Sequence, residues 1–327
     1  MGHDKLRKFA ENETFSCLLQ PSAEELLRDG YFALRDHSVK GCWGERFANP
    51  GAPLVLELGC GKGEYTIALA ERDSGKNFVG VDIKGARLWK GAKYATEHAL
   101  GNVGFLRTRI EFITAFFAPG EVSEIWLTFS DPQVRSENSR LTSPVFLERY
   151  SHFLAPGGLI HLKTDSQFLY QYTLAVCRAN NLPVLASSED LYAEAASFDP
   201  CLTEVQTFYE SMFREQGYPI KYLCFKLDAE DGAADAGSVS GNCGRPWPHE
   251  WGGPADSERQ WGGRSEAEVS GGTSCVAEPS SASPSAPFIS PSDFDPDYWR
   301  SVEGNRTLFG RDTAETRRQK LRKAKEQ

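Results

Sequence analysis

From residue 53 to residue 227, short apolar runs alternate with amphipathic stretches along the chain. Each apolar run has the length and composition of a buried strand, and each amphipathic stretch has the spacing of a helix. The predicted strands span residues 54–58, 77–83, 103–108, 124–129, 158–164 and 220–227. The predicted helices span residues 64–72, 85–99, 110–117, 144–154, 166–179 and 204–216. This alternation indicates βαβ units, so we expect an α/β fold with a doubly wound, mostly parallel sheet and helices on both faces.

The residues before this pattern form a lead-in, residues 1–50. Its first part, residues 4–15, is basic and then acidic, with a few apolar positions. Such a segment is either a solvated arm or a flexible arm that becomes ordered on a large anionic partner. We therefore place the folded domain at residues 51–227.

The composition changes sharply in the tail, residues 228–327. Up to about residue 290 the tail is mostly Gly, Ser, Ala, Pro and acidic residues, which bury too little apolar surface to offset the entropy of ordering, so it is predicted to be disordered. Residues 294–309 are richer in aromatic side chains and form either a docking motif or an ordered decoration. Residues 315–327 are a basic run, which is either a solvated tail or an RNA contact.

The overall composition excludes some classes of protein. The chain has 327 residues, a net charge of −9 and eight cysteines. Because the charge is negative, any contact with nucleic acid must come from a local patch. The cysteines form no CxxC pair and have no zinc-site spacing to histidine, which is typical of a reduced, cytoplasmic protein with no metal. No stretch resembles a signal peptide or reaches membrane-spanning length, so we expect no membrane contact.

The first predicted strand runs directly into a glycine-rich turn, within the sequence LVLELGCGKGEY at residues 54–65. Three glycines let the backbone approach a ligand closely, and the helix that follows presents unpaired N–H groups. A carboxylate in an apolar run, as at Glu57, is costly to bury without a partner. Taken alone, this stretch predicts either a ligand cradle or a sheet-to-helix turn that binds nothing.

Carboxylates recur at the ends of the predicted strands. An open α/β sheet binds its ligand outside the carboxyl ends of its strands. Four strands end at or beside an acidic residue: Glu57, Asp82, Asp131 and Asp165. Asp82 follows the glycine turn at the distance typical of an acid that holds ribose hydroxyls. This clustering favours a ligand site over a bare turn.

The glycine pattern at residues 57–63, ELGCGKG, differs from the GxGxxG of dinucleotide folds. It resembles the first motif of class I S-adenosylmethionine-dependent methyltransferases, and the PGG turn at residues 156–158 strengthens the resemblance. The resemblance implies a Rossmann-like domain with a seven-stranded sheet and S-adenosyl-L-methionine as cofactor. The cofactor-binding residues that it implies are Glu57, for the cationic methionine end, Asp82, for the ribose, and Gly59, Gly61 and Gly63.

Three further stretches narrow the family: FSDPQVRSENSRL at residues 129–141, KTD at 163–165 and TFYE at 207–210. Together they resemble the FxDP, KTD and TxYE motifs of bacterial tRNA (guanine-N7-)-methyltransferases. The resemblance implies tRNA as partner and guanosine 46 of its variable loop as target. It also implies that Asp131 is catalytic and contacts both the cofactor and the guanine. The implied substrate-binding residues are Arg135, Asp165, Thr207, Tyr209 and Glu210.

The sequence departs from this family after Asp131. Ser130 and Gln133 replace the usual proline and tryptophan, and the loop at residues 133–140 is less basic than the family pattern. Fewer cations facing RNA should weaken phosphate contacts and make binding less dependent on salt. The residues that could compensate are Lys5, Arg7, Lys8, Lys40, Arg107, Arg109 and the basic run at the C-terminus.

Two alternatives to this function remain open at the level of sequence. One is a methyltransferase of the same fold that acts on another RNA position, a protein or a small molecule. The other is an RNA-binding scaffold that keeps the fold but has lost efficient catalysis. The retained acids at the strand ends favour an active enzyme, whereas the altered loop at residues 133–140 keeps both alternatives open.

Overall fold

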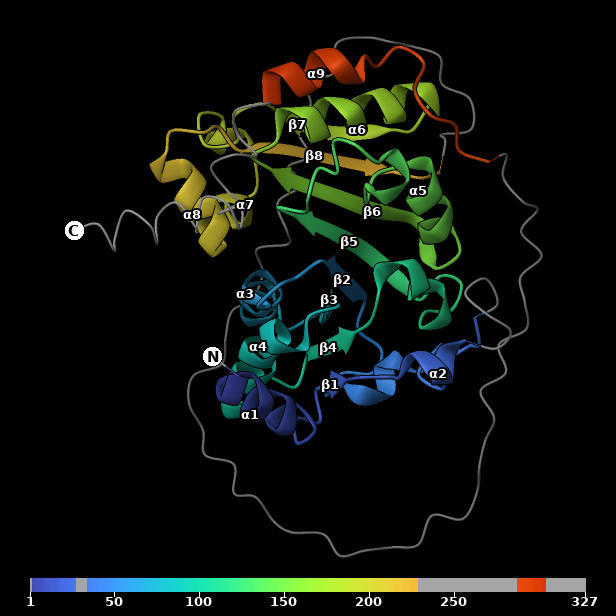
Figure 1. Ribbon diagram of the computed structural model, residues 1–327, viewed down its shortest axis with the longest axis vertical. Coiled ribbons are helices and arrows are strands. Elements are labelled where there is room, and N and C mark those ends of the chain that lie inside the picture. Colours follow the sequence, from blue (N-terminus) through green and yellow to red (C-terminus); the bar gives the residue numbers. More distant parts are fainter. Residues whose placement is uncertain (1, 28–33, 229–286, 304–327) are drawn as a thin grey trace, which may run out of the picture. The chain divides into compact units, whose positions relative to one another are not determined.

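The computed structural model of the protein describes residues 2–27, 34–228 and 287–303. Their strands form one eight-stranded sheet in the order β1-β4-β3-β2-β5-β6-β8-β7 (Figure 1). The strands are β1 (Leu18–Leu19), β2 (Leu54–Leu58), β3 (Asn77–Asp82), β4 (Val103–Arg107), β5 (Val122–Thr128), β6 (Leu154–Thr164), β7 (Val184–Ser188) and β8 (Lys221–Lys226). Neighbouring strands from β1 to β6 are parallel, whereas β8 is antiparallel to both β6 and β7. The doubly wound, mostly parallel sheet is therefore confirmed, with the two-residue β1 as one strand more than the expected seven.

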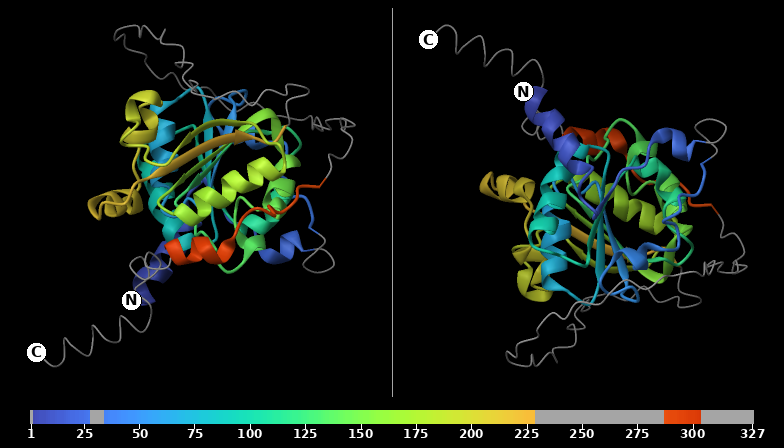
Figure 2. Two further views of the ribbon diagram at one scale, coloured as in Figure 1. Left: turned by 90° about the horizontal axis from the view of Figure 1, so that it is seen from above. Right: turned by 90° about the horizontal axis from the view of Figure 1, so that it is seen from below.

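Helices cover both faces of the sheet (Figure 2). They are α1 (Gly2–Asn12), α2 (Ala23–Leu26), α3 (Glu64–Arg72), α4 (Gly85–Glu97), α5 (Pro144–Ser151), α6 (Gln167–Ala179), α7 (Cys201–Glu204), α8 (Phe208–Glu215) and α9 (Pro296–Glu303). Short 3-10 helices are η1 (Trp43–Arg46), η2 (Ile110–Ala115), η3 (Glu137–Ser139) and η4 (Ala195–Ser197). No helix in the described ranges is long and apolar enough to cross a membrane.

Strand β2 shows how the sequence pattern builds the two cores. Successive side chains of a strand point to opposite faces of the sheet. Leu54, Leu56 and Leu58 accordingly lie in the core on the side of α5 and α6, whereas Val55 lies in the core with α3 and α4. The same alternation directs Glu57 toward the α3 side. The sheet order reverses at β2, which pairs with β3 on one side and β5 on the other, so the glycine turn lies at the switch point where open α/β sheets bind ligands.

The expectation of a solvated or flexible N-terminal arm was wrong. Residues 2–12 form α1, which packs against α4. Asn12 is buried, and its side-chain amide donates to the carbonyl of Gly85 at 3.0 Å. The Trp89 indole donates to Glu11 at 2.6 Å. Because these partners come from a distant part of the chain, the mixed charge of residues 4–15 alone could not predict a packed helix.

Two other predicted elements differ in the structure. The helix expected at residues 204–216 begins only at Phe208, as α8, and Glu204 is instead the last residue of α7. Thr207 adopts an extended conformation and caps α8 by accepting from the N–H of Glu210 at 3.1 Å. The helix expected at residues 110–117 is the shorter 3-10 helix η2. Strand β7 was not predicted, because its side chains are mostly half-buried and form no apolar run.

The tail is described only in part. The stretch predicted to be disordered falls largely on residues 229–286, which lie outside the described residues, as do residues 304–327 with the basic run. Residues 287–303 contain α9 and pack against α6. From residue 288 on, this segment belongs to the same compact unit as the sheet.

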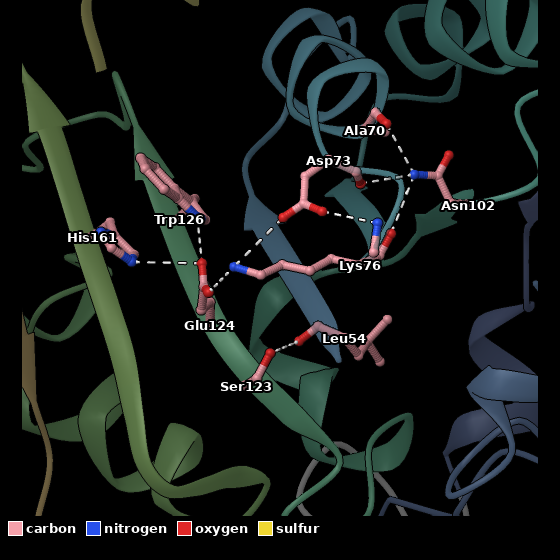
Figure 3. Close-up of polar contacts among 10 residues, drawn as sticks. Leu54, Ala70, Asp73, Lys76, Asn102, Ser123, Glu124, Trp126 and His161 are labelled. Carbon is pink, nitrogen blue, oxygen red and sulfur yellow. Dashed lines mark hydrogen bonds and ion pairs between the residues drawn. The ribbon is translucent and has the colours of Figure 1, made fainter. Parts of the chain in front are cut away.

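A partly buried polar cluster joins Lys76, the residue before β3, to side chains of β5 and β6 (Figure 3). Lys76 Nζ lies 2.5 Å from a Glu124 oxygen, and the other oxygen of Glu124 lies 3.8 Å from His161 Nε2. The His161 ring stacks on Trp126 with centroids 4.0 Å apart, and its Nδ1 is 2.8 Å from the Tyr222 hydroxyl. Burial lowers the pKa of His161 to about 4, so its imidazole is neutral at pH 7.

We expect His161 to make the fold sensitive to acid. Its pKa is lower in the folded chain than in the unfolded one, where it has the usual value of 6.5, so stability is lost as the pH falls from 6.5 toward 4. Between pH 7.5 and pH 5 this contribution is about 2 kcal/mol. His161→Phe, which keeps a ring against Trp126, should remove it. Urea unfolding of both proteins at the two pH values measures the difference, and equal losses of free energy would contradict the assignment.

Candidate functional site

A cleft of about 780 Å³ opens at the carboxyl ends of the central strands. We call it the cleft throughout. Its walls come from the glycine turn after β2, the ends of β5 and β6, the start of α8, and the end of α9. The cleft brings together seven of the residues predicted from the sequence: Glu57, Gly59, Gly61, Asp131, Asp165, Thr207 and Tyr209. The other four, Gly63, Asp82, Arg135 and Glu210, are not among its lining residues.

The three glycines of the turn have different roles. All three have positive φ angles, 81° at Gly59, 60° at Gly61 and 73° at Gly63, which favour glycine. A Cβ atom on Gly59 or Gly61 would meet nothing within 4 Å, so these two positions face open space in the cleft. A Cβ on Gly63 would lie 2.5 Å from the Phe105 ring. Gly63 therefore allows close packing beneath the turn, whereas Gly59 and Gly61 form the open cradle.

Glu57 lies at the base of the cleft with its carboxylate buried between two threonines. One oxygen accepts from the backbone N–H of Thr66 at 2.8 Å and from the Thr66 hydroxyl, and the other accepts from the Thr128 hydroxyl. Burial raises the pKa of Glu57 to about 7, against the opposing effect of these hydrogen bonds. The carboxylate is thus held in place and poised to gain or lose a proton near neutral pH.

Asp82 shapes the turn from behind. Its carboxylate accepts from the N–H of Gly61 at 3.1 Å and from the N–H of Lys84 at 2.7 Å. It is 7% exposed, at the end of β3 beside the glycine turn. A carboxylate that bonds to both loops fixes the distance between them, so Asp82 couples the cradle to the loop that follows β3.

The opposite wall of the cleft carries two further carboxylates. Asp131 follows β5 and accepts from the N–H of Gln133 at 3.0 Å, which closes a tight turn. Asp165 follows β6 and is half-buried, and its carbonyl accepts from the Lys221 ammonium at 3.1 Å. Since β5 and β6 are adjacent and parallel, the topology places both acids at one edge of the sheet.

The TFYE stretch divides between the cleft and the interior. Thr207 and Tyr209 line the cleft, whereas Glu210 is fully buried and pairs with Lys163 at 2.7 Å. The Tyr192 hydroxyl also donates to Glu210, at 2.8 Å. Arg135 is exposed on the loop after Asp131. Roles for Glu210 and Arg135 in binding substrate stay predictions.

Phe208 and Glu303 are two of the cleft residues that sequence reasoning missed. Phe208 is 58% exposed at the mouth of the cleft, with the Lys62 ammonium 5.0 Å from its ring centroid. Glu303, from α9, is buried and lines the cleft. The only signal for Glu303 was the aromatic composition of residues 294–309, which indicated a docking motif or an ordered decoration but gave no position for it. Among the described residues, no group of three or more His, Cys, Asp or Glu side chains could hold a metal ion.

The strand order, the glycine cradle and the acids at the strand ends define a class I methyltransferase domain. The family model described as "Putative methyltransferase" matches residues 51–223. A tRNA (guanine-N(7)-)-methyltransferase of Christiangramia forsetii is 49% identical over 226 residues, which are 68% of this chain and 98% of the relative. One of Bacteroides thetaiotaomicron is 46% identical over 232 residues, 70% of this chain and 88% of the relative. The chain belongs to the tRNA (guanine-N7-)-methyltransferase family.

Among solved structures, the 16S rRNA methyltransferase KamB aligns with 60% of this chain and 96% of its own, with 15% sequence identity and a TM-score of 0.44.

The cofactor is S-adenosyl-L-methionine, and the residues present fit it. Gly59 and Gly61 leave open space on the cleft side of the turn. Glu57 lines the cleft with a carboxylate, which suits a cationic group, and the cleft volume lies within the range of roughly 300–1,000 Å³ found for small-molecule sites. Glu57, Gly59 and Gly61 would therefore hold the cofactor, with Asp82 behind them.

Proposed function

We propose that this protein transfers a methyl group from S-adenosylmethionine to N7 of a guanosine in tRNA, and that the target is guanosine 46 of the variable loop. One observation carries this proposal. A single cleft joins the glycine cradle to Asp131, Asp165, Thr207 and Tyr209, which the family motifs assign to the guanine side. We also propose that residues 51–227 form the catalytic domain and that the protein acts in the cytoplasm, where tRNA is modified.

Methyl transfer to guanine N7 depends more on the position of the base than on activation of N7 by a general base. When bound, the cofactor supplies an electrophilic methyl group. Guanine N7 is an exposed lone pair, so it needs no general base, and the residues must align it in line with the methyl group and exclude competing groups. We assign Asp131 and Asp165 as acceptors for the N1–H and exocyclic amine of the guanine. These donors lie on the edge of the base away from N7, so the acids can hold the base without blocking the reacting atom.

The target base must leave its stack to enter the cleft, as in other enzymes that modify nucleic-acid bases. Phe208 and Tyr209 are 58% and 47% exposed at the cleft mouth, and their rings meet edge to face. Aromatic faces at such a position can stack on an unpaired base. This arrangement supports an RNA acceptor over a small molecule.

The basic residues of α1 are partly neutralised by their own helix. Lys8 pairs with Asp4 at 3.0 Å, and Arg7 pairs with both Asp4 and Glu11. These pairs reduce the charge available to phosphates. They support the expectation that tRNA binding by this chain depends only moderately on salt.

Cofactor binding should strengthen as the pH rises through neutrality. Because the pKa of Glu57 is about 7, a cationic ligand beside it favours the ionised carboxylate. The affinity for S-adenosylmethionine should rise up to about tenfold between pH 6 and pH 8. Calorimetric titration at these pH values tests this, with Glu57→Gln as the variant that should lose the pH dependence. The same pH dependence in both proteins would show that another group is responsible.

The function is tested by methyl transfer to tRNA that lacks the modification. We expect tritium from labelled S-adenosylmethionine to enter bulk tRNA, and aniline to cleave the product at N7-methylguanosine in the variable loop. Label without aniline cleavage would indicate another RNA position. Bound cofactor without any label in tRNA would indicate a different acceptor or a scaffold without efficient catalysis.

A further inference from the structure

Residues 287–303 lie beyond the match to the methyltransferase family, which stops at residue 223, and they run along α6 (Figures 1 and 2). Phe294 meets the rings of Phe168 and Tyr172 edge to face, with both centroid distances 5.3 Å. Asn180, just after α6, donates to the carbonyl of Ile289 at 2.9 Å and accepts from its N–H at 2.7 Å. The segment is thus attached at both ends of α6.

Helix α9 contacts the two elements that follow the acids of the guanine side. Arg300 and Glu303 are one helical turn apart, so they lie on the same face of α9. The Arg300 guanidinium donates to the carbonyl of Val134 at 2.8 Å, in the loop that begins at Asp131. A Glu303 oxygen accepts from the N–H of Phe168 at 3.1 Å, in the first turn of the helix that begins after Asp165.

The contact made by Glu303 meets a specific need of α6. The N–H groups in the first turn of a helix have no acceptor within the helix, and the positive end of the helix dipole favours a carboxylate there. Ser166 accepts from Leu169 at 3.0 Å, and Glu303 accepts from Phe168. Glu303 is 3% exposed and lines the cleft, which keeps a volume of about 780 Å³ with Glu303 in place. The end of α9 is therefore part of the wall of the cleft.

We propose that α9 is a brace that sets the position of Asp131 relative to Asp165, with Arg300 and Glu303 as positioning residues for methyl transfer. This inference rests on the proposed function, because it assigns both acids to the guanine. Two carboxylates that grip one base must keep a fixed spacing, and a misplacement of about 1 Å can cost up to about a hundredfold in rate. The brace holds the loop after one acid and the helix after the other.

The test compares full-length variants in steady-state methylation of unmodified tRNA and in calorimetric binding of S-adenosylmethionine. Glu303→Ala should lower kcat/KM for tRNA about tenfold while the Kd for the cofactor changes less than about twofold. Glu303→Gln should stay within about threefold of the wild type, because its amide oxygen still accepts from Phe168. Arg300→Ala, at a side chain that is 39% exposed and tolerant of change, carries the test if Glu303→Ala does not fold.

Asp293→Ala is the matched control. Asp293 lies on the same segment as Glu303, but it does not line the cleft. Its carboxylate is 56% exposed and pairs with Arg178 of α6 at 3.1 Å. An exposed pair of this kind contributes little to stability, so we expect wild-type kinetics and cofactor affinity. A loss in this variant equal to that in Glu303→Ala would show that any disturbance of the segment has the same effect and would overturn the role of Glu303.

Amide hydrogen exchange tests the brace independently of the proposed function, because it does not require methyl transfer. In Glu303→Ala the Phe168 amide should exchange faster, and in Arg300→Ala the amides of residues 133–140 should do so. Wild-type protein that methylates no tRNA would refute the proposed function, while the exchange rates still decide whether α9 braces these elements. Wild-type kinetics and exchange in both alanine variants would overturn the brace. Equal losses in Glu303→Gln and Glu303→Ala would overturn it too, since charge and not position would then matter.

Discussion

Asp131→Ala should abolish methyl transfer to tRNA while leaving the fold intact. Asp131 lines the cleft after β5, and we assign it to hold the acceptor base. Removing one group that stabilises or orients the reacting partners typically costs about 10²–10³-fold in kcat. The side chain is exposed and accepts a hydrogen bond from the N–H of Gln133, and because substitutions at exposed positions change stability little, the melting temperature should change by no more than about 2 °C.

The measurement is single-turnover methylation with saturating cofactor, alongside thermal unfolding. Asp131→Asn is the matched variant, because its amide oxygen can still accept from Gln133 while the charge is gone. If the carboxylate acts on the guanine, both variants are severely impaired. If Asp131 only shapes its turn, the asparagine variant keeps its activity. Near-normal turnover in Asp131→Ala would remove Asp131 from the site.

Asp82→Ala should lower the affinity for S-adenosylmethionine by about a hundredfold or more. The substitution leaves the N–H groups of Gly61 and Lys84 without the carboxylate that joins the cradle to the loop after β3. Hydrogen bonds to charged groups contribute about 1.5–3 kcal/mol each, and about 1.4 kcal/mol corresponds to a tenfold change in affinity. Binding of tRNA, which uses the other wall of the cleft, should change little.

Calorimetric titration with S-adenosylhomocysteine measures this effect without turnover. Asp73→Ala is a suitable control, because Asp73 also closes a turn, accepting from the N–H of Gly75 at 2.9 Å, but follows α3 at the other end of β3. We expect cofactor affinity in this control within about twofold of the wild type. An Asp82→Ala protein that binds the cofactor within threefold of wild type would show that the cradle holds its shape and its ligand without this carboxylate.

Local sequence predicted the elements whose burial is decided by their own residues. The run at residues 54–58 is strand β2 as predicted, and the predicted strand at 103–108 differs from β4 by one residue. Both are central strands whose apolar runs are covered on two faces, so pattern and packing agree. The glycine turn and the acids at the strand ends followed from the same pattern, since parallel strands bring their carboxyl ends to one edge.

Elements that depend on distant partners were predicted poorly. Helix α1 was expected to be a mobile arm because its charges are mixed, yet contacts with α4 order it. The sequence also did not predict that Glu210 would be buried in a pair with Lys163, which is 47 residues earlier in the chain; a role for Glu210 in binding substrate stays a prediction. The spacing of apolar residues, every two in a strand or every 3.6 in a helix, indicates which face of the element is buried. It does not indicate which distant residue pairs with a buried charge.

The amino-acid sequence by itself determined the sheet, the cofactor cradle and the family, because these depend on short-range periodicity, on glycines that allow positive φ angles, and on acids placed directly after strands. Only the tertiary structure decided which acids share the cleft and which are neutralised inside the fold. It also brought residues 287–303 back onto α6 and placed Glu303 in the wall of the cleft. The physical reason is that helix docking and ion pairing depend on three-dimensional distance, which separation along the chain does not determine.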